Sequence, residues 1–386
     1  MKLQTVSSPE VHVLVDELFS SELHAKRVRS LSNATVGVIE AGTLAISAIG
    51  RGLALANQLK WKHTIKQVDR LIGNPAVDPW ELAVRWVPFV VGAQTEVVVA
   101  LDWTDFDSDG QSTIALNLVT GHGRATPLLW KTVEKRHLAK RRNEFEDAVL
   151  QRFKETVPSS VTKVTVLADR GFGDASLYEA LKSEWGFDYV IRFRAGVLVT
   201  DASGHTLPAK DWLSPSGRSK LLRDVKVTKR HVAVPAVALC HAKGMKDAWC
   251  LAVGDSSRTA KEAVALYAKR FSIEENFRDI KDLRFGMGLS MTRVSTPERR
   301  DRLLLVSALA IALLTMLGAG GEKADLEKHY KANTSKQRTF SLFRQGCMYY
   351  ESLPGMRAEW AEPLIENFVE LLRAEPVFNQ LFIAPK

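Results

Sequence analysis

Residues 96–103 read Glu-Val-Val-Val-Ala-Leu-Asp-Trp, and this stretch carries the clearest structural signal of the chain. An uninterrupted run of Val, Ala and Leu is typical of a strand that is buried on both faces of a sheet. Asp102 follows the run, and we expect it to close the strand. Such a carboxylate is informative because an unpaired charge in a buried place is costly.

The segments downstream continue the pattern. Further strands are expected at 112–120 and 126–133, with a turn at Gly121-His122-Gly123, and at 163–168 and 188–193. Helices are expected at 138–156, 175–185 and, as one long helix, 258–281. Strand signals start before this set, near Ala83. In chain order the core reads β-β-β-α-β-α-β, an interruption, then α, which is the order of the ribonuclease H-like fold. The expected fold class is therefore α/β.

Three acidic residues lie where this fold can bring them together. Asp102 closes the first strand, Asp169 follows the strand 163–168, and Glu274 lies in the late helix. Each one alone is explained equally well by a solvated strand end or a salt bridge. Together they indicate a site for two divalent ions, Mg²⁺ or Mn²⁺, because hard cations prefer oxygen ligands and paired ions promote in-line phosphoryl transfer. No His/Cys cluster has zinc spacing.

A spaced set of residues surrounds Glu274. Tyr267, Arg270, Glu274 and Lys281 follow the pattern Tyr-x2-Arg-x3-Glu-x6-Lys. These offsets put all four side chains on one face of a continuous helix. A metal-binding carboxylate would then share its face with two cations that can hold phosphates.

With these motifs the chain resembles the DDE transposases of bacterial insertion sequences, in the group with the Tyr-Arg-Glu-Lys (YREK) signature, the IS four group. Members of this group move DNA by a hairpin-forming cut-and-paste route. The resemblance covers about residues 15 to 320, and it rests on three stretches: Leu101-Asp102-Trp103-Thr104, Ala168-Asp169-Arg170-Gly171-Phe172, and Tyr267 to Lys281.

The resemblance implies roles for individual residues. Asp102, Asp169 and Glu274 would be the catalytic, metal-binding triad. Cations and aromatic residues would contact DNA: Tyr267, Arg270, Lys281, Arg192, and Arg170, which would also orient Asp169. Trp249 lies near the place where relatives have a tryptophan that stacks on a flipped base, which is reasonable for an unpaired base. The competing interpretation of Trp249 is a core residue that closes the inserted strands.

The chain has a basic excess: 53 Lys and Arg against 44 Asp and Glu give a net charge of +9. Such an excess favours a polyanionic partner. In residues 1–78, expected helices at 43–58 and 63–72 resemble a helix-turn-helix, and the second carries Lys66 and Arg70. An ordinary helical bundle with a solvated basic face explains these residues as well.

An interruption at 195–253 separates the two parts of the expected core, 79–194 and 254–320. It is expected to form a β insertion subdomain of short strands and turns. Residues 192–230 hold nine Lys or Arg and three Asp, a net charge of +6. We interpret this concentration as a surface that follows DNA phosphates, and a solvated β subdomain is the alternative. Residues 321–386 are expected to be helical and to supply the contact surface of a synaptic homodimer.

Several features limit the other classes of function. The apolar run 303–319 is short for a membrane span and is flanked by charges, so we expect a buried core helix and no membrane partner. Three cysteines and no apolar leader favour a reducing compartment, here the bacterial cytoplasm with nucleoid association. Cys240 and Cys250 are expected to be free buried thiols. Asp105-x-Asp107-x-Asp109-Gly110 opens like a calcium loop, but Leu116 stands where the bidentate Glu is required, so a polar turn is expected.

The expected activity is cut-and-paste DNA transposition: end cleavage, hairpin formation and strand transfer on double-stranded DNA. Two rivals remain open at this point. One is an inactive DNA-binding regulator of transposition, and the other is a structure-specific nuclease of the same fold.

Overall fold

A computed structural model describes residues 8–336 and 338–373. Residues 1–7, where no leader is expected, residue 337, and residues 374–386 at the end of the expected C-terminal helical region lie outside the described residues.

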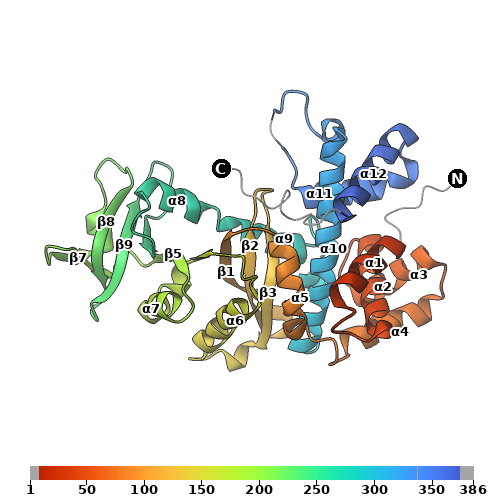
Figure 1. Cartoon of the computed structure of the whole chain (residues 1–386), viewed down its shortest axis with the longest axis horizontal. Coiled ribbons are helices and arrows are strands. Elements are labelled where there is room, and N and C mark those ends of the chain that lie inside the picture. Colours follow the sequence, from red (N-terminus) through yellow and green to blue (C-terminus); the bar gives the residue numbers. More distant parts are fainter. Residues whose placement is uncertain (1–7, 337, 374–386) are drawn as a thin grey trace.

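One mixed sheet runs through the described part of the chain (Figure 1). Its strand order is β3-β2-β1-β4-β5-β10-β9-β8-β6-β7. The first three strands pair antiparallel, whereas β1 pairs parallel with β4, and β4 pairs parallel with β5. The strands are β1 (Glu96–Phe106), β2 (Gln111–Val119), β3 (Ala125–Glu134), β4 (Lys163–Ala168), β5 (Asp188–Phe193), β6 (Leu198–Thr200), β7 (Thr206–Pro208), β8 (Lys220–Val227), β9 (Val232–Cys240) and β10 (Trp249–Val253).

Helices cover both faces of this sheet, so the expected α/β class is confirmed. On one face Ala100, Leu167 and Leu251 pack against α8 (Ala260–Ala268) and α9 (Phe271–Lys281). The alternate residues, such as Val99 and Val166, join the main core on the opposite face. That face is covered by α5 (Pro79–Val91), α6 (Arg142–Thr156) and α7 (Ala175–Ser183).

The buried strands are close to the predicted ones, but three of the expected elements are wrong. The segment near Ala83 is helix α5, which Asp78 caps at Trp80 N and which starts with Pro79. Strand β1 continues to Phe106, so Asp102 lies inside the strand opposite Ala115. The long helix 258–281 is two helices, joined at Lys269 and Arg270 by hydrogen bonds of the tighter i to i−3 type.

The N-terminal residues form α1 (Ser8–Phe19), α2 (Ala25–Ala41), α3 (Ile46–Asn57) and α4 (Trp61–Ile72). Helices α3 and α4 approach closely, since a Cβ on Gly50 would lie 2.5 Å from the Ile65 Cα atom. Lys66 and Arg70 on α4 are exposed.

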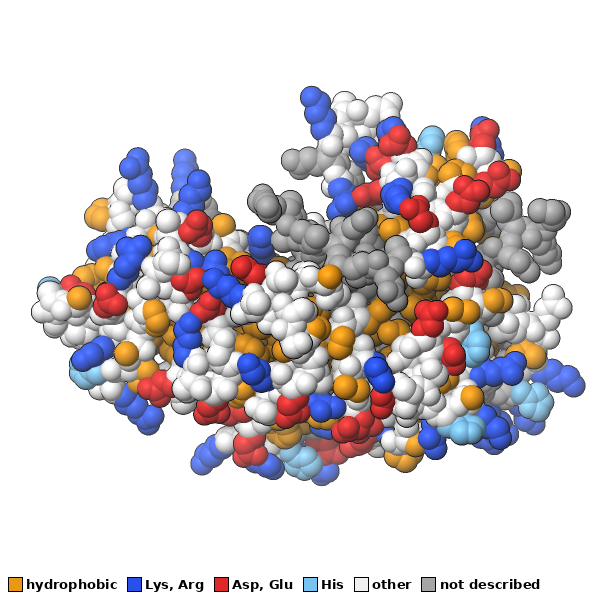
Figure 2. Space-filling model, viewed as in Figure 1, with side chains coloured by type: hydrophobic (Ala, Val, Ile, Leu, Met, Phe, Trp, Pro, Cys, Tyr) orange, Lys and Arg blue, Asp and Glu red, His pale blue; other side chains and the backbone are white. Residues whose placement is uncertain are grey.

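Residues 195–253 continue the central sheet, because β10 pairs antiparallel with β5 and carries β9, β8, β6 and β7 beyond it. Lys and Arg side chains gather over the β8–β9 end of the molecule in Figure 2. Cys240 and Cys250 are buried free thiols, as expected.

Helix α10 (Pro297–Lys323) stands between the sheet and the N-terminal helices (Figure 1). Among the described helices it alone is long and apolar enough to cross a membrane, and its most apolar window is fully buried within the molecule. The expected core helix is therefore confirmed. Helices α11 (Leu342–Ser352) and α12 (Ala358–Arg373) pack against it.

Candidate active site

The three acidic residues lie on elements that contact one another: β1, the turn after β4, and α9. Leu101 pairs with Ala168 in the parallel β1–β4 ladder, so Asp102 and Asp169 are the next residues on neighbouring strands. Glu274 lies in the first turn of α9, which packs against β1. The negative charges of Asp169 and Glu274 both act on Asp102.

Arg270 connects two of these carboxylates. Its Nη1 atom lies 3.0 Å from Asp102 Oδ2, and its Nη2 atom donates to Glu274 Oε1. The guanidinium is almost fully buried, whereas half of the Glu274 side chain is exposed. The helix breaks at Arg270, whose side chain contacts Asp102 on β1, while Glu274 lies in the first turn of the next helix.

Burial raises the pKa of Asp102 to about 6, and the charges of Asp169 and Glu274 act in the same direction. Arg270 and a hydrogen bond from Trp103 N oppose the rise. These carboxylates repel one another in a partly desolvated site. A bound cation would reduce that repulsion.

Asp169 is positioned by the backbone. Its Oδ1 atom accepts a hydrogen bond from Gly171 N at 2.7 Å, in a short 3-10 turn at residues 170–172. Arg170 was expected to orient Asp169, and this is wrong: the Arg170 side chain is exposed and its Nη1 atom lies 4.0 Å from Asp247 Oδ2. The backbone amide does the orienting because the turn brings it within hydrogen-bond distance.

The other signature residues hold neighbouring parts of the site. Lys281 Nζ donates to Thr104 Oγ1 and to the Asp105 carbonyl, and burial lowers its pKa. Tyr267 is fully buried under Arg270, with its ring 5.9 Å from the guanidinium carbon. The four side chains therefore do not share one face of a continuous helix. Arg270 and Lys281 contact residues of β1, and Glu274 is joined to β1 through Arg270.

Trp249 begins β10 and is half-buried. Its ring meets Tyr267 edge-on at 4.9 Å and stacks near Phe271 at 6.3 Å. This placement puts it beside the signature residues and leaves part of the ring accessible. Base stacking by Trp249 stays a prediction.

Two acidic side chains near the site gave no sequence signal. Asp247 Oδ2 forms an ion pair at 3.6 Å with Arg192 Nη2, which donates a hydrogen bond to the Ala248 carbonyl. Glu146, from α6, accepts from Trp103 Nε1 at 2.7 Å and is itself buried. Asp247 lies in a loop and Glu146 in a helix. Their distance from the site depends on the tertiary structure, so no local sequence pattern reports it.

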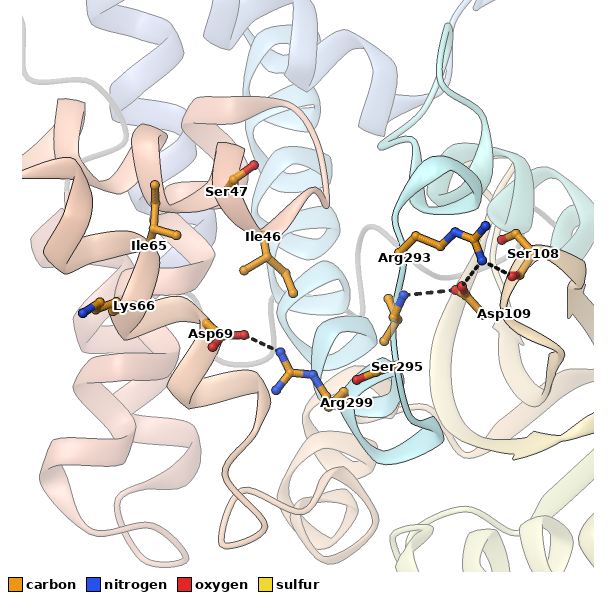
Figure 3. Close-up of a pocket in the computed structure, with 11 residues that line it drawn as sticks. Ile46, Ser47, Ile65, Lys66, Asp69, Ser108, Asp109, Arg293, Ser295 and Arg299 are labelled. Atoms are coloured by element: carbon orange, nitrogen blue, oxygen red, sulfur yellow. Dashed lines mark hydrogen bonds and ion pairs between the residues drawn. The ribbon is translucent and has the colours of Figure 1, made fainter.

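A groove separates the N-terminal helices from the core (Figure 3). Lys66 lines it from α4, whereas Arg70 is not among its lining residues. Arg299 crosses the groove to Asp69, and Arg293 reaches Ser108 and Asp109, which form the turn after β1. The residues after β1, Asp107 to Gly110, form the expected polar turn, whereas Asp105 still lies in β1, and Asp109 pairs with Arg293 and Arg300.

The donor chemistry of the triad suits a hard divalent cation, since all of its side chains are carboxylates. In residues 8–336 and 338–373, however, no three His, Cys, Asp or Glu side chains are grouped closely enough to hold a metal ion. The Arg270 guanidinium donates to Asp102 and to Glu274, and so occupies carboxylate oxygens that a cation would need.

Comparison with known proteins adds a family. The model of the family described as "Transposase DDE domain" matches residues 94–313, which covers the strands and helices that carry the triad and the signature. A search among curated proteins finds no significant match. The match spans more than half of the chain, and the chain therefore belongs to the DDE transposase family.

Proposed function

We propose that this transposase binds the ends of a mobile DNA element and moves it by metal-dependent cleavage, hairpin formation and strand transfer. The observation that supports the proposal is the placement of Asp102, Asp169 and Glu274 on adjacent elements, with the charges of the other two acting on Asp102. Arg270 ties the helix that bears Glu274 to the strand that bears Asp102.

The strand order supports a ribonuclease H-like core. In β3-β2-β1-β4-β5 the first three strands are antiparallel and the last three parallel, with Asp102 in the middle strand β1 and Asp169 directly after the neighbouring β4. The division into residues 1–78, the two-part core, the insertion and the C-terminal region remains our proposal for the domains.

DDE transposases generally use divalent metal ions, and we propose Asp102, Asp169 and Glu274 as the ligands of two Mg²⁺ or Mn²⁺ ions. Such ions activate an attacking oxygen and stabilise the leaving oxygen. Ion binding and phosphate contact both require that Arg270 leaves Asp102 and Glu274. The carboxylates are then available to the ions, and Arg270 can contact a phosphate. Lys281 flanks this position and would hold the DNA backbone, whereas Tyr267 is buried beneath Arg270 and would reach the DNA only after the Arg270 side chain has moved.

The proposed reaction is a series of in-line phosphoryl transfers. Water attacks a phosphorus atom at the element end and releases a 3′-hydroxyl. This hydroxyl attacks the opposite strand, which frees the flanking DNA and leaves a hairpin. Water reopens the hairpin, and the 3′-hydroxyl then attacks a target phosphodiester. Each step exchanges one P–O bond for another, so a single site serves all of them.

The transposase domain implies that DNA is the partner. We propose a homodimer in the synaptic complex with α11 and α12 at the subunit contact, and a location with the bacterial nucleoid. Contacts to double-stranded DNA are proposed for Arg192, Arg170, Lys66 and Arg70 in addition to the signature residues. The basic β8–β9 end would follow DNA phosphates.

The test uses purified protein, Mg²⁺ or Mn²⁺, and labelled DNA with the sequences that flank its reading frame. We expect nicks, hairpins and joined products on a denaturing gel. Glu274→Gln should abolish all three and leave binding to the ends largely intact. Cleavage by that variant would remove Glu274 from the site.

The same gel separates the rival functions. Binding to the ends without cleavage by the native protein would identify a regulator. Hydrolysis without hairpins or joined products would identify a nuclease.

A further inference from the structure

Trp103 holds one oxygen of Asp102 through its backbone. Its N atom donates to Asp102 Oδ1 at 2.9 Å, whereas Arg270 contacts the other oxygen, Oδ2. The β1–β4 ladder ends at the Leu101–Ala168 pair, and beyond it β1 remains paired with β2 but not with β4. The orientation of the Trp103 peptide group therefore depends on the β2 pairing and on what holds the Trp103 side chain.

The Trp103 side chain lies on the face of the sheet opposite Asp102, because successive side chains of a strand alternate between faces. Ala100, and with it Asp102, belongs to the face covered by α8 and α9, whereas Trp103 packs against the main core on the other face. Helix α6 covers this other face beside β2 and β3 (Figure 1). Contacts of α6 with Trp103 thus act on Asp102 from behind the sheet.

Two residues of α6 fix the Trp103 ring. Glu146 Oε1 accepts a hydrogen bond from Trp103 Nε1 at 2.7 Å, and the Arg142 guanidinium carbon lies 5.1 Å from the centre of the ring. Glu146 and Arg142 are neighbours on one face of the helix, because residues four apart lie one turn from each other. The hydrogen bond fixes the edge of the indole, and the cation–π contact fixes its plane. We call Glu146 and Arg142 the α6 clamp.

Packing alone does not favour a glutamate at this position. Glu146 is 8% exposed, and burial raises its pKa, while the hydrogen bond from Trp103 and the charge of Arg142 oppose the rise. A buried carboxylate costs free energy that an uncharged glutamine would not cost. The carboxylate, however, accepts a shorter and stronger hydrogen bond. Glu146 is therefore suited to holding Trp103 in one place at a cost in stability.

We propose that the α6 clamp positions the candidate active site: Glu146 and Arg142 hold Trp103, and Trp103 N keeps Asp102 Oδ1 oriented for a divalent ion. This hydrogen bond does not involve Oδ2, so it does not depend on Arg270 and can remain when Arg270 leaves the carboxylate. Groups that orient a metal-binding carboxylate contribute to the affinity for the metal ion. The inference rests on the proposed function and deepens it, because it names the residues that position one ligand of the ion.

The test measures Mn²⁺ affinity in the full-length protein. Glu146→Ala removes the acceptor, and Trp103→Phe keeps an aromatic ring without the Nε1 hydrogen. Both changes should weaken Mn²⁺ binding in isothermal titration calorimetry at least about tenfold and raise the Mn²⁺ concentration for half-maximal end cleavage in proportion. The Kd for end DNA should stay unchanged. Glu146→Gln should keep most of the Mn²⁺ affinity, because its amide oxygen can accept the same hydrogen bond.

Gln151→Ala is the matched control. Gln151 lies on the same helix and accepts from the Nε1 atom of the buried Trp185 at 2.9 Å, so this change removes a similar hydrogen bond away from Asp102. It should leave the Mn²⁺ affinity unchanged. In protein with isotope-labelled tryptophan, the indole proton resonance of Trp103 reports the hydrogen bond itself. It should move upfield in Glu146→Ala and hardly move in Glu146→Gln.

Unchanged Mn²⁺ affinity in both Glu146→Ala and Trp103→Phe would overturn the role of the α6 clamp. An equal loss of affinity in Gln151→Ala would also overturn it, because the effect would then be one of general stability. If the native protein binds Mn²⁺ and cleaves DNA ends while these variants match it, the proposed function stands and the clamp alone is removed. If the native protein neither binds Mn²⁺ nor cleaves, both are removed.

Discussion

At the scale of single residues, Arg270 is the side chain that joins two carboxylates of the candidate site. One buried guanidinium pairs with both Asp102 and Glu274, and the Tyr267 ring lies beneath it. A divalent cation and this guanidinium would use the same carboxylate oxygens, so the two compete.

We expect Arg270→Gln to raise the Mn²⁺ affinity of the DNA-free protein by about tenfold, equivalent to ~1.4 kcal/mol. Isothermal titration calorimetry with Mn²⁺ checks this. Arg278→Gln is the matched control, because Arg278 pairs with Glu275 on the same helix and lies at the surface. Weaker Mn²⁺ binding by Arg270→Gln would mean that the arginine instead holds the carboxylates in place for the ion.

We expect the raised pKa of Asp301 to make the free energy of unfolding depend on pH. It is buried at the start of α10, accepts from Thr132 N at 2.9 Å, and burial raises its pKa from 3.8 to about 7. Below about pH 4 the carboxyl is protonated in both the folded and the unfolded chain. Between pH 4 and 7 only the unfolded chain loses the proton, so this residue lowers the free energy of unfolding as the pH rises, and the loss is complete above about pH 7.

Asp301→Asn should therefore stabilise the protein by up to about 4 kcal/mol at pH 8, since the pKa of Asp301 rises from 3.8 to about 7, and hardly at all at pH 4. The amide oxygen can still accept from Thr132 N. Urea unfolding at the two pH values measures the difference. An equal effect at both would show that packing, and not ionisation, distinguishes the two side chains.

At the scale of elements, the α10–α11 crossing depends on glycine. A Cβ on Gly346 would lie 1.8 Å from the Leu314 carbonyl oxygen, and one on Gly318 would lie 1.9 Å from that of Leu342. The two backbones are in direct contact, so neither glycine leaves room for a side chain.

Gly346→Ala should lower the free energy of unfolding by about 3 kcal/mol or more, because the helices must move apart. Gly355→Ala is the control, since its Cβ would meet nothing within 4 Å. Urea unfolding of both variants gives the comparison. Similar stabilities would mean that the crossing adapts without loss of packing.

Elements whose signal is local were predictable from the sequence. The strands at 163–168 and 188–193 have the expected bounds, because short Val-rich runs between polar turns have few alternatives. Helix α5 was not found, since its Val-rich sequence resembles a strand and the cap at Asp78 with Pro79 was the decisive signal. The break between α8 and α9 carries no Gly or Pro. It coincides with the reach of Arg270 to Asp102, and no local pattern reports such a contact.

In the candidate site, too, some features had a local sequence signal and others did not. The aspartates after two buried runs indicated the meeting of β1 and β4, because parallel strands end at one edge. The Arg270 bridge, the Gly171 amide on Asp169, and the contacts of Asp247 depend on tertiary placement, so the sequence alone did not predict them.

At the scale of the whole molecule, the pairing of β5 with β10 makes residues 195–253 part of the central sheet. A subdomain attached by flexible linkers would open independently, whereas strands in one sheet unfold together.

We expect the amide of Leu251 in β10 to exchange hydrogen as slowly as that of Val99 in β1, with protection free energies equal within about 1 kcal/mol. Both residues are fully buried in paired strands. Native-state hydrogen exchange read by mass spectrometry measures this. Faster exchange throughout β8, β9 and β10 would identify the insertion as a separately folding unit.

The continuous sheet also fixes the distance between the candidate site and the basic strand β8. From β1, with Asp102, to β8, whose Lys220, Arg223 and Lys226 are exposed, the order crosses β4, β5, β10 and β9. Five inter-strand steps of ~4.8 Å give about 24 Å. Hydrogen-bonded ladders do not stretch, so this interval is constant. A duplex laid across it would place about seven base pairs between the cut and the basic strand, and sequence changes that add or remove bases there would shift every contact beyond them.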